Sequence, residues 1–164
     1  MPTDYERKEI TARLSMLVEK RISNRTPYWA SEVGIFASMG AWVPRVDYMA
    51  FCPNWKTVED PSPITVEHGR FEFYEVKSCI ADFESGHGLN FEGDDNFLVC
   101  TRELATRLRD EMKIPPFAHV IVPDAKWGKL VTIFEPSSSY SARKRCASEL
   151  LLCLLIAYKR RIVR

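Results

Sequence analysis

Residues 71–79 read Phe-Glu-Phe-Tyr-Glu-Val-Lys-Ser-Cys, an aromatic-rich segment that predicts a β-strand. Successive side chains of a strand point to opposite faces of the sheet, so Glu75 and Lys77 share one face with Phe71 and Phe73. A core-facing strand would normally continue with apolar side chains, because burying an unpaired charge costs several kcal/mol. The Glu75–Lys77 pair therefore belongs either to a structural ion pair or to a chemical site.

The preceding strand carries a similar anomaly. Residues 42–51 predict a strand in which Asp47 lies in the same row as Met49 and Phe51. If the two strands pair, Asp47 and Glu75 converge beside Lys77. Two carboxylates, the backbone carbonyl of Val76 and water are hard oxygen ligands, which suit Mg²⁺ or Mn²⁺. Such an ion could activate a water for attack on a phosphodiester, while Lys77 orients that water or stabilises the charge on the phosphate.

A third acidic residue, Glu32, lies upstream. Thr26-Pro27 is typical of a helix start and Gly40 of a helix end, so the sequence predicts a helix over 27–39. Glu32 lies one turn before Phe36 on this predicted helix. Its side chain could then point to the sheet and complete the outer shell of the metal ion.

The other segments complete an α/β pattern. We expect helices at 4–22, 102–112 and 141–161, strands at 96–101, 118–122 and 130–134, and a long loop or irregular arm at 52–69. This order predicts a single domain over 1–164 with a central mixed sheet flanked by helices. Its N-terminal helix lies within 1–25, and a basic C-terminal helix lies within 141–164.

The composition fits one compact soluble domain, with 164 residues of which 46% are hydrophobic. The longest apolar run, 150–157, is far shorter than the roughly 20 residues of a membrane-spanning helix. The charged N-terminal segment lacks the apolar stretch of a signal peptide, so we expect a cytoplasmic protein. The five cysteines contain no Cys-x-x-Cys pair and are expected to be reduced thiols.

The distribution of charge is more informative than its total. Basic and acidic side chains number 23 and 22, but residues 26–140 hold 10 basic and 17 acidic side chains, whereas residues 141–164 hold seven basic and one acidic. An acidic middle with basic ends is compatible with a polyanion-binding enzyme that has a carboxylate-rich metal site, and also with a solvated basic helix.

Taken together, Glu32 on a predicted helix, Asp47 on the next strand and Glu75-Val-Lys77-Ser78 on the strand after it resemble the PD-(D/E)xK nuclease superfamily. The continuation through 75–83 and 96–105 resembles its MmcB-like branch of DNA-repair-associated and phage-encoded members. The similarity covers residues 28–157. The sequence departs from the name-giving motif at Val46, where proline would precede the aspartate, and segment 52–69 is longer than in the shortest members.

The resemblance implies a restriction-endonuclease-like fold and a Mg²⁺- or Mn²⁺-dependent deoxyribonuclease that acts in DNA repair or recombination, or in a phage or mobile element. In that superfamily the residues matching Asp47 and Glu75 hold the metal, the lysine matching Lys77 is catalytic, and the glutamate matching Glu32 assists. The expected partner is DNA, with no membrane. A homodimer or a complex with a repair protein would be compatible with this role.

Further DNA contacts can be named from charge and position. Arg143, Lys144 and Arg145 in the basic C-terminal segment are candidates for phosphate contacts, the alternative being a solvated helix end. His87 lies in a polar loop just after the Glu75–Lys77 strand and could reach DNA, the alternative being an exposed loop histidine.

Three other interpretations stay open. A catalytically inactive nuclease fold could bind DNA or a repair partner, because folds are retained after their chemistry is lost. A structural protein of a phage or mobile element would have no nucleic-acid role. Asp47, Glu75 and Lys77 could also form an ion network in an ordinary α/β domain.

Overall fold

The computed structural model describes residues 3–36, 44–54, 62–137 and 143–162. The elements, in chain order, are α1 (Asp4–Ser23), β1 (Trp29–Gly34), β2 (Arg45–Cys52), α2 (Pro63–Glu67), β3 (Arg70–Lys77), α3 (Ile80–Glu84), β4 (Asp95–Cys100), α4 (Arg102–Asp110), β5 (His119–Pro123), β6 (Leu130–Phe134) and α5 (Ala147–Ile162).

The six strands form one mixed sheet in the order β1-β2-β3-β4-β5-β6. The first three strands pair antiparallel, β3, β4 and β5 pair parallel, and β6 returns antiparallel to β5. Short connections suffice for the antiparallel pairs, whereas the parallel β4–β5 pair is joined through α4, as a crossover requires. The predicted α/β architecture with a central mixed sheet and flanking helices is confirmed.

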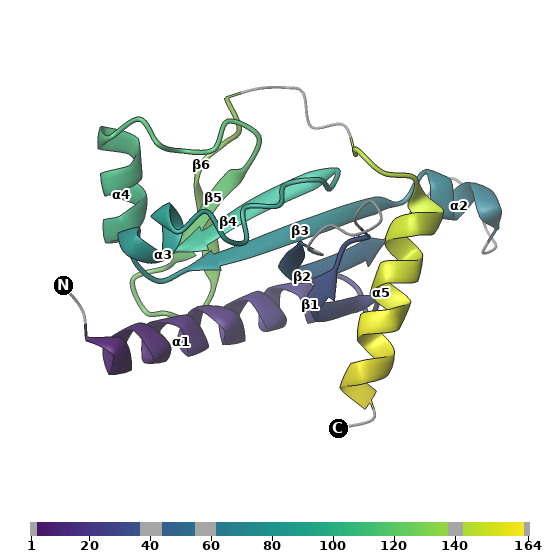
Figure 1. Cartoon of the computed structure of the whole chain (residues 1–164), viewed down its shortest axis with the longest axis horizontal. Coiled ribbons are helices and arrows are strands. Elements are labelled where there is room, and N and C mark those ends of the chain that lie inside the picture. The colour runs from purple at the N-terminus through teal and green to yellow at the C-terminus, as the bar shows by residue number, and fades with distance from the viewer. Residues whose placement is uncertain (1–2, 37–43, 55–61, 138–142, 163–164) are drawn as a thin grey trace.

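Helices cover both faces of the sheet (Figure 1). The long α1 packs its apolar side, including Leu14 and Val18, against Tyr74 and Val76 of β3. On the opposite face α5 covers β1–β3, with Leu150 buried near Phe71 and Phe73. At the other end of that face α4 covers β4 and β5. The face that carries Phe71 and Phe73 also carries Glu75 and Lys77, in the space between α5 and α4.

Local signals explain several helix boundaries. Thr3 and Glu6 form a reciprocal capping box at the start of α1, with Glu6 N–H donating to Thr3 Oγ1 at 3.3 Å. Thr101 caps α4 by accepting from the N–H of Leu104 at 3.2 Å. The two helices begin at Asp4 and Arg102, where the sequence predicts them to begin.

The predicted helix over 27–39 is wrong. Its described part contains the strand β1, and residues 37–39 lie outside the described residues. The Thr26 hydroxyl does not cap a helix. It donates to the carbonyl of Phe51 at 2.7 Å and accepts from the N–H of Tyr28 at 3.1 Å. These bonds hold the segment against β2. Pairing with β2 then satisfies the backbone hydrogen-bonding groups of the segment in the strand conformation.

Smaller differences concern the ends of elements. The last helix begins at Ala147 rather than at 141, and a short helix, α2, lies within the predicted 52–69 loop. Residues 42–43 of the second predicted strand lie outside the described residues. In the described part of the chain no helix combines the length and the apolarity that crossing a bilayer requires.

Candidate active site

Asp47 lies where β2 and β3 part. The strand register pairs Tyr48 with Tyr74, and its continuation by one residue brings Asp47 opposite Glu75. There the Asp47 carboxylate replaces a backbone acceptor, since its Oδ2 accepts from the N–H of Val76 at 2.7 Å. Burial raises the pKa of Asp47, while the Val76 N–H and the Lys77 charge act to lower it. The strand end therefore holds a carboxylate between two strands.

Glu75 is fully buried beside Asp47. Its Oε1 accepts from the backbone N–H of Asn90 at 3.1 Å, and the backbone N–H of Asp47 also donates to the carboxylate. Its Oε2 is buried without a hydrogen-bond partner. Burial, followed by the nearby Asp47 charge, raises the pKa of Glu75 to about 9. The metal-free site therefore holds this carboxyl in its protonated form at neutral pH.

Lys77 is the third member of the group, and its side chain is only 5% exposed. Its Nζ donates to the carbonyl of His87 at 2.5 Å and lies 3.6 Å from Oδ1 of Asp82. Gly88 packs closely over both charged residues. A Cβ there would lie 2.9 Å from Oε2 of Glu75 and 3.5 Å from Nζ of Lys77, and its φ of 67° also favours glycine.

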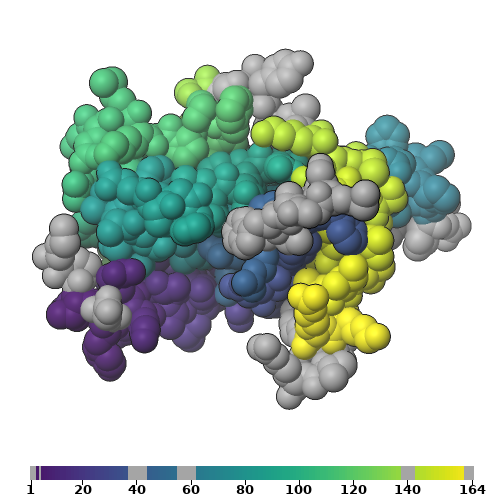
Figure 2. Space-filling view, viewed as in Figure 1, coloured from purple at the N-terminus to yellow at the C-terminus, as the bar shows by residue number. Residues whose placement is uncertain are grey.

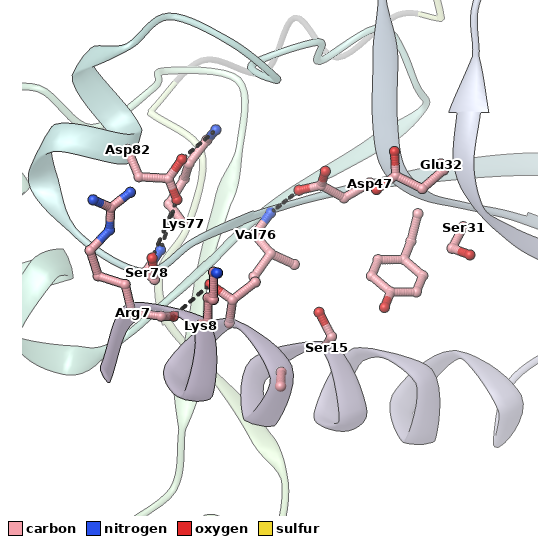
Figure 3. A pocket seen from close by; sticks show the side chains of 13 residues that line it. Arg7, Lys8, Ser15, Ser31, Glu32, Asp47, Val76, Lys77, Ser78 and Asp82 are labelled. Atoms are coloured by element: carbon pink, nitrogen blue, oxygen red, sulfur yellow. Dashed lines mark hydrogen bonds and ion pairs between the residues drawn. The ribbon is translucent and has the colours of Figure 1, made fainter. Parts of the chain in front are cut away.

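A cavity of about 740 Å³ opens beside these groups, between α1 and the ends of β1, β2 and β3 (Figure 3). Asp47, Lys77 and Asp82 line it, whereas Glu75 lies buried next to its wall. The other lining residues are Arg7, Lys8, Thr11, Ala12, Ser15, Ser31, Glu32, Tyr48, Val76 and Ser78. Polar and charged side chains dominate this set, as expected for a site that binds a charged ligand.

Glu32 reaches the same cavity from β1 and not from a helix, which corrects the predicted element. Its backbone has a φ of 53° and its side chain is 65% exposed. The carboxylate pairs with Arg45 at 3.2 Å, and its charge acts to raise the pKa of Asp47. The role of Glu32 as a support for the metal shell stays a prediction.

The donor set suits a small divalent cation. Glu75 Oε2 is a buried oxygen without a partner, and Asp47 contributes a second carboxylate at the same strand end. Among the described residues no group of three or more His, Cys, Asp or Glu side chains converges for a metal. Mg²⁺ is commonly held through one or two carboxylates with several waters, so two acids fit it. The Val76 carbonyl as a further ligand stays a prediction.

The candidate DNA contacts lie elsewhere. Arg145 pairs with Glu92 and with Glu149 at 2.5 Å, and Arg143 donates to the carbonyls of Glu67 and Gly69. Through Asp94 and Glu92, residues 143–145 contact the loop before β4, and Arg143 also contacts the turn between α2 and β3. They are not among the residues that line the cavity, and a DNA contact stays a prediction for them. His87 approaches the site through its backbone carbonyl.

Several residues around the site were not expected from the sequence. Asp82 anchors Lys77 and accepts from the N–H of Ser78 at 3.2 Å, and Asn90 ties Glu75 to the backbone of Arg45. No local sequence pattern predicts these contacts, because they depend on how the chain turns after β3. The polar row of α1, by contrast, is visible as regular spacing at residues 7, 8, 11 and 15.

Comparison with known proteins supports the fold alone. No protein-family model and no curated protein matches the sequence. A solved structure of a protein of unknown function from Silicibacter pomeroyi resembles this chain with a TM-score of 0.56 and 17% sequence identity. The similarity covers 94% of this chain and 87% of that one, so the two proteins share a fold over most of their length.

Proposed function

We propose that this chain is a Mg²⁺-dependent deoxyribonuclease that hydrolyses phosphodiester bonds in DNA, in repair or recombination or in a phage or mobile element. The observation that carries the proposal is the convergence of Asp47, Glu75 and Lys77 at the point where β2 and β3 part, next to an open polar cavity. This is the residue order of the PD-(D/E)xK pattern, in which two acids and a lysine act on a phosphodiester.

Asp47 and Glu75 would hold the ion through Oδ and Oε oxygens at the strand end. When bound, the ion polarises the phosphodiester and lowers the pKa of a water. The close packing of Gly88 over Glu75 and Lys77 excludes bulk water from these groups, which strengthens the electrostatic interactions among them. Lys77 is held by Asp82 and the carbonyl of His87 at the wall of the cavity, where it would stabilise a growing phosphate charge.

The decisive experiment measures Mg²⁺- and Mn²⁺-dependent cleavage of single-stranded and double-stranded DNA by the wild type, Lys77→Ala and Lys77→Met. We expect cleavage in the wild type and a loss of at least about 100-fold in both variants, since removing one group that stabilises transition-state charge typically costs this much. Lys77→Met keeps the aliphatic stem, so it separates the lost charge from a lost fold.

Lys126→Ala is the matched control, because Lys126 is an exposed lysine on the β5–β6 turn away from the cavity. Circular dichroism and thermal unfolding should show that the Lys77 variants remain folded. Full activity in a folded Lys77→Met protein would overturn the assignment of the site, and so would equal loss in Lys126→Ala.

A catalytically inactive DNA-binding protein is the second candidate. It is favoured by the engagement of Lys77 with His87 and Asp82, and by the lack of a third converging metal ligand among the described residues. Salt-sensitive DNA binding by the wild type without metal-dependent cleavage would select this function.

A further inference from the structure

The α1 side of the cavity is lined by residues with no part in metal binding. Arg7, Lys8, Thr11 and Ser15 come from the first four turns of the helix and line the same cavity as Asp47. In the close-up, Arg7, Lys8 and Ser15 rise from α1 toward the strand ends that carry Asp47 and Lys77 (Figure 3). The helix therefore presents a second wall opposite the candidate metal ligands.

This wall follows from the periodicity of α1. Leu14 and Val18, with Ile10 before them, form the apolar stripe that packs against the sheet. The row at 7, 8, 11 and 15 runs beside that stripe, and its spacing of about one turn keeps these side chains on one side of the helix. Burial of the apolar stripe thus determines that the polar row faces the cavity.

The charges on the two walls are complementary to a phosphate with a bound cation. Glu32 is paired with Arg45 at 3.2 Å, and Asp82 faces Lys77 at 3.6 Å. A divalent ion at Asp47 and Glu75 would compensate the remaining acidic charge. Lys8 would then add uncompensated positive charge to the α1 wall beside the Arg7 guanidinium, which favours an anion in the cavity.

We propose that Arg7 and Lys8 bind backbone phosphates of the nucleic-acid strand that enters the cavity. This inference rests on the proposed function, and it names the wall that positions the strand beside Asp47. Contacts of this type do not read bases, so binding through them is independent of sequence.

Binding without cleavage tests the inference. Fluorescence anisotropy with labelled single-stranded oligonucleotides in a fixed concentration of CaCl₂, which supplies a divalent ion in place of Mg²⁺, over a series of KCl concentrations gives the slope of log K against log salt. Each lost phosphate contact should reduce that slope by about 0.7 for single strands. We expect this reduction, and weaker binding to oligonucleotides of different sequence, for Arg7→Ala and for Lys8→Ala. Lys126→Ala should keep the wild-type slope.

Thermal unfolding separates binding from folding, because neither Arg7 nor Lys8 belongs to the apolar stripe and both variants should keep the wild-type Tm. If the wild type cleaves DNA while both α1 variants retain the wild-type slope and KM, the α1 wall is not a phosphate site and the nuclease proposal stands. If the slope of log K against log salt is reduced in the variants but the wild type does not cleave DNA, the phosphate-binding role of α1 is supported and the nuclease proposal is refuted. A wild type that neither binds nor cleaves overturns both.

Discussion

At the scale of single residues, the unusual feature is a carboxyl group buried beside another carboxylate. Glu75 is fully buried, one of its oxygens has no hydrogen-bond partner, and the charge of the nearby Asp47 acts to raise its pKa. Such an arrangement lowers stability in the absence of a cation, because the ionised form is desolvated and repelled. Its retention in the sheet is understandable if a cation binds there.

The first prediction concerns pH. The pKa of Glu75 is raised from 4.5 to about 9 in the folded metal-free protein. Above about pH 4.5 the unfolded chain releases this proton while the folded chain keeps it, so stability falls as the pH rises toward about 9. One proton corresponds to at most about 1.4 kcal/mol per pH unit. Chemical denaturation in EDTA across this range should show the decline.

Glu75→Gln should flatten this pH dependence, since an amide does not titrate. Glu103→Gln, at an exposed helical position, should keep the wild-type profile. An identical decline in Glu75→Gln and in the wild type would show that Glu75 ionises at its ordinary pKa in the folded protein.

At the scale of elements, α5 and α1 build the site from opposite faces of the sheet. Leu150 of α5 is fully buried in the cluster that contains Phe71 and Phe73, which lie four and two residues before Glu75 on the same strand face. The helix α5 covers only the apolar part of β3. The charged end of that strand is covered by the segment that follows α3. The boundary between apolar and charged residues on β3 thus coincides with the edge of the α5 contact.

Leu150→Ala should therefore reduce the free energy of unfolding by about 2–5 kcal/mol, the range for buried leucines. Leu152, which lies on the same helix but is 48% exposed, offers a matched control. Leu152→Ala should change stability by no more than about 0.5 kcal/mol. Urea denaturation measures both, and equal losses would contradict the observed packing side of α5.

At the scale of the whole molecule, the candidate site is part of one continuous sheet, and the helices on both faces of the domain pack against that sheet. The helices α1 and α5 occupy opposite ends of the visible face in the space-filling view (Figure 2), and β3 runs between the two clusters that they cover. A cation that binds the ends of β2 and β3 binds only the folded arrangement of the domain. It should therefore stabilise the domain as a whole and not only the local strand end.

Titration of MgCl₂ at constant ionic strength should then raise the Tm of the EDTA-treated protein. At a concentration about 100 times the Kd the gain is about 2.7 kcal/mol, or roughly 5–10 °C for a domain of this size. Asp47→Asn should abolish the shift, whereas Asp110→Asn, at a position on the surface of α4, should keep it. A wild-type Tm that is unaffected by Mg²⁺ would refute the metal site.

Local sequence patterns were sufficient for most elements and for the core of the candidate site. Alternation along residues 71–77 put Glu75 and Lys77 on one face, and the neighbouring strand carried Asp47 to the same place, because side-chain direction in a strand has a period of two whatever the surroundings. The starts of α1 at Asp4 and of α4 at Arg102 likewise agree with the helices expected from residues 4 and 102.

Tertiary structure alone decided the rest. Segment 29–34 became a strand because its backbone pairs with β2 and the Thr26 hydroxyl bonds to Phe51, contacts between residues far apart in sequence that outweigh a local helix signal. The fold also brought Asp82, Asn90 and the polar row of α1 around Asp47. Short-range periodicity determines which way a side chain points, but only packing over long range determines what it meets.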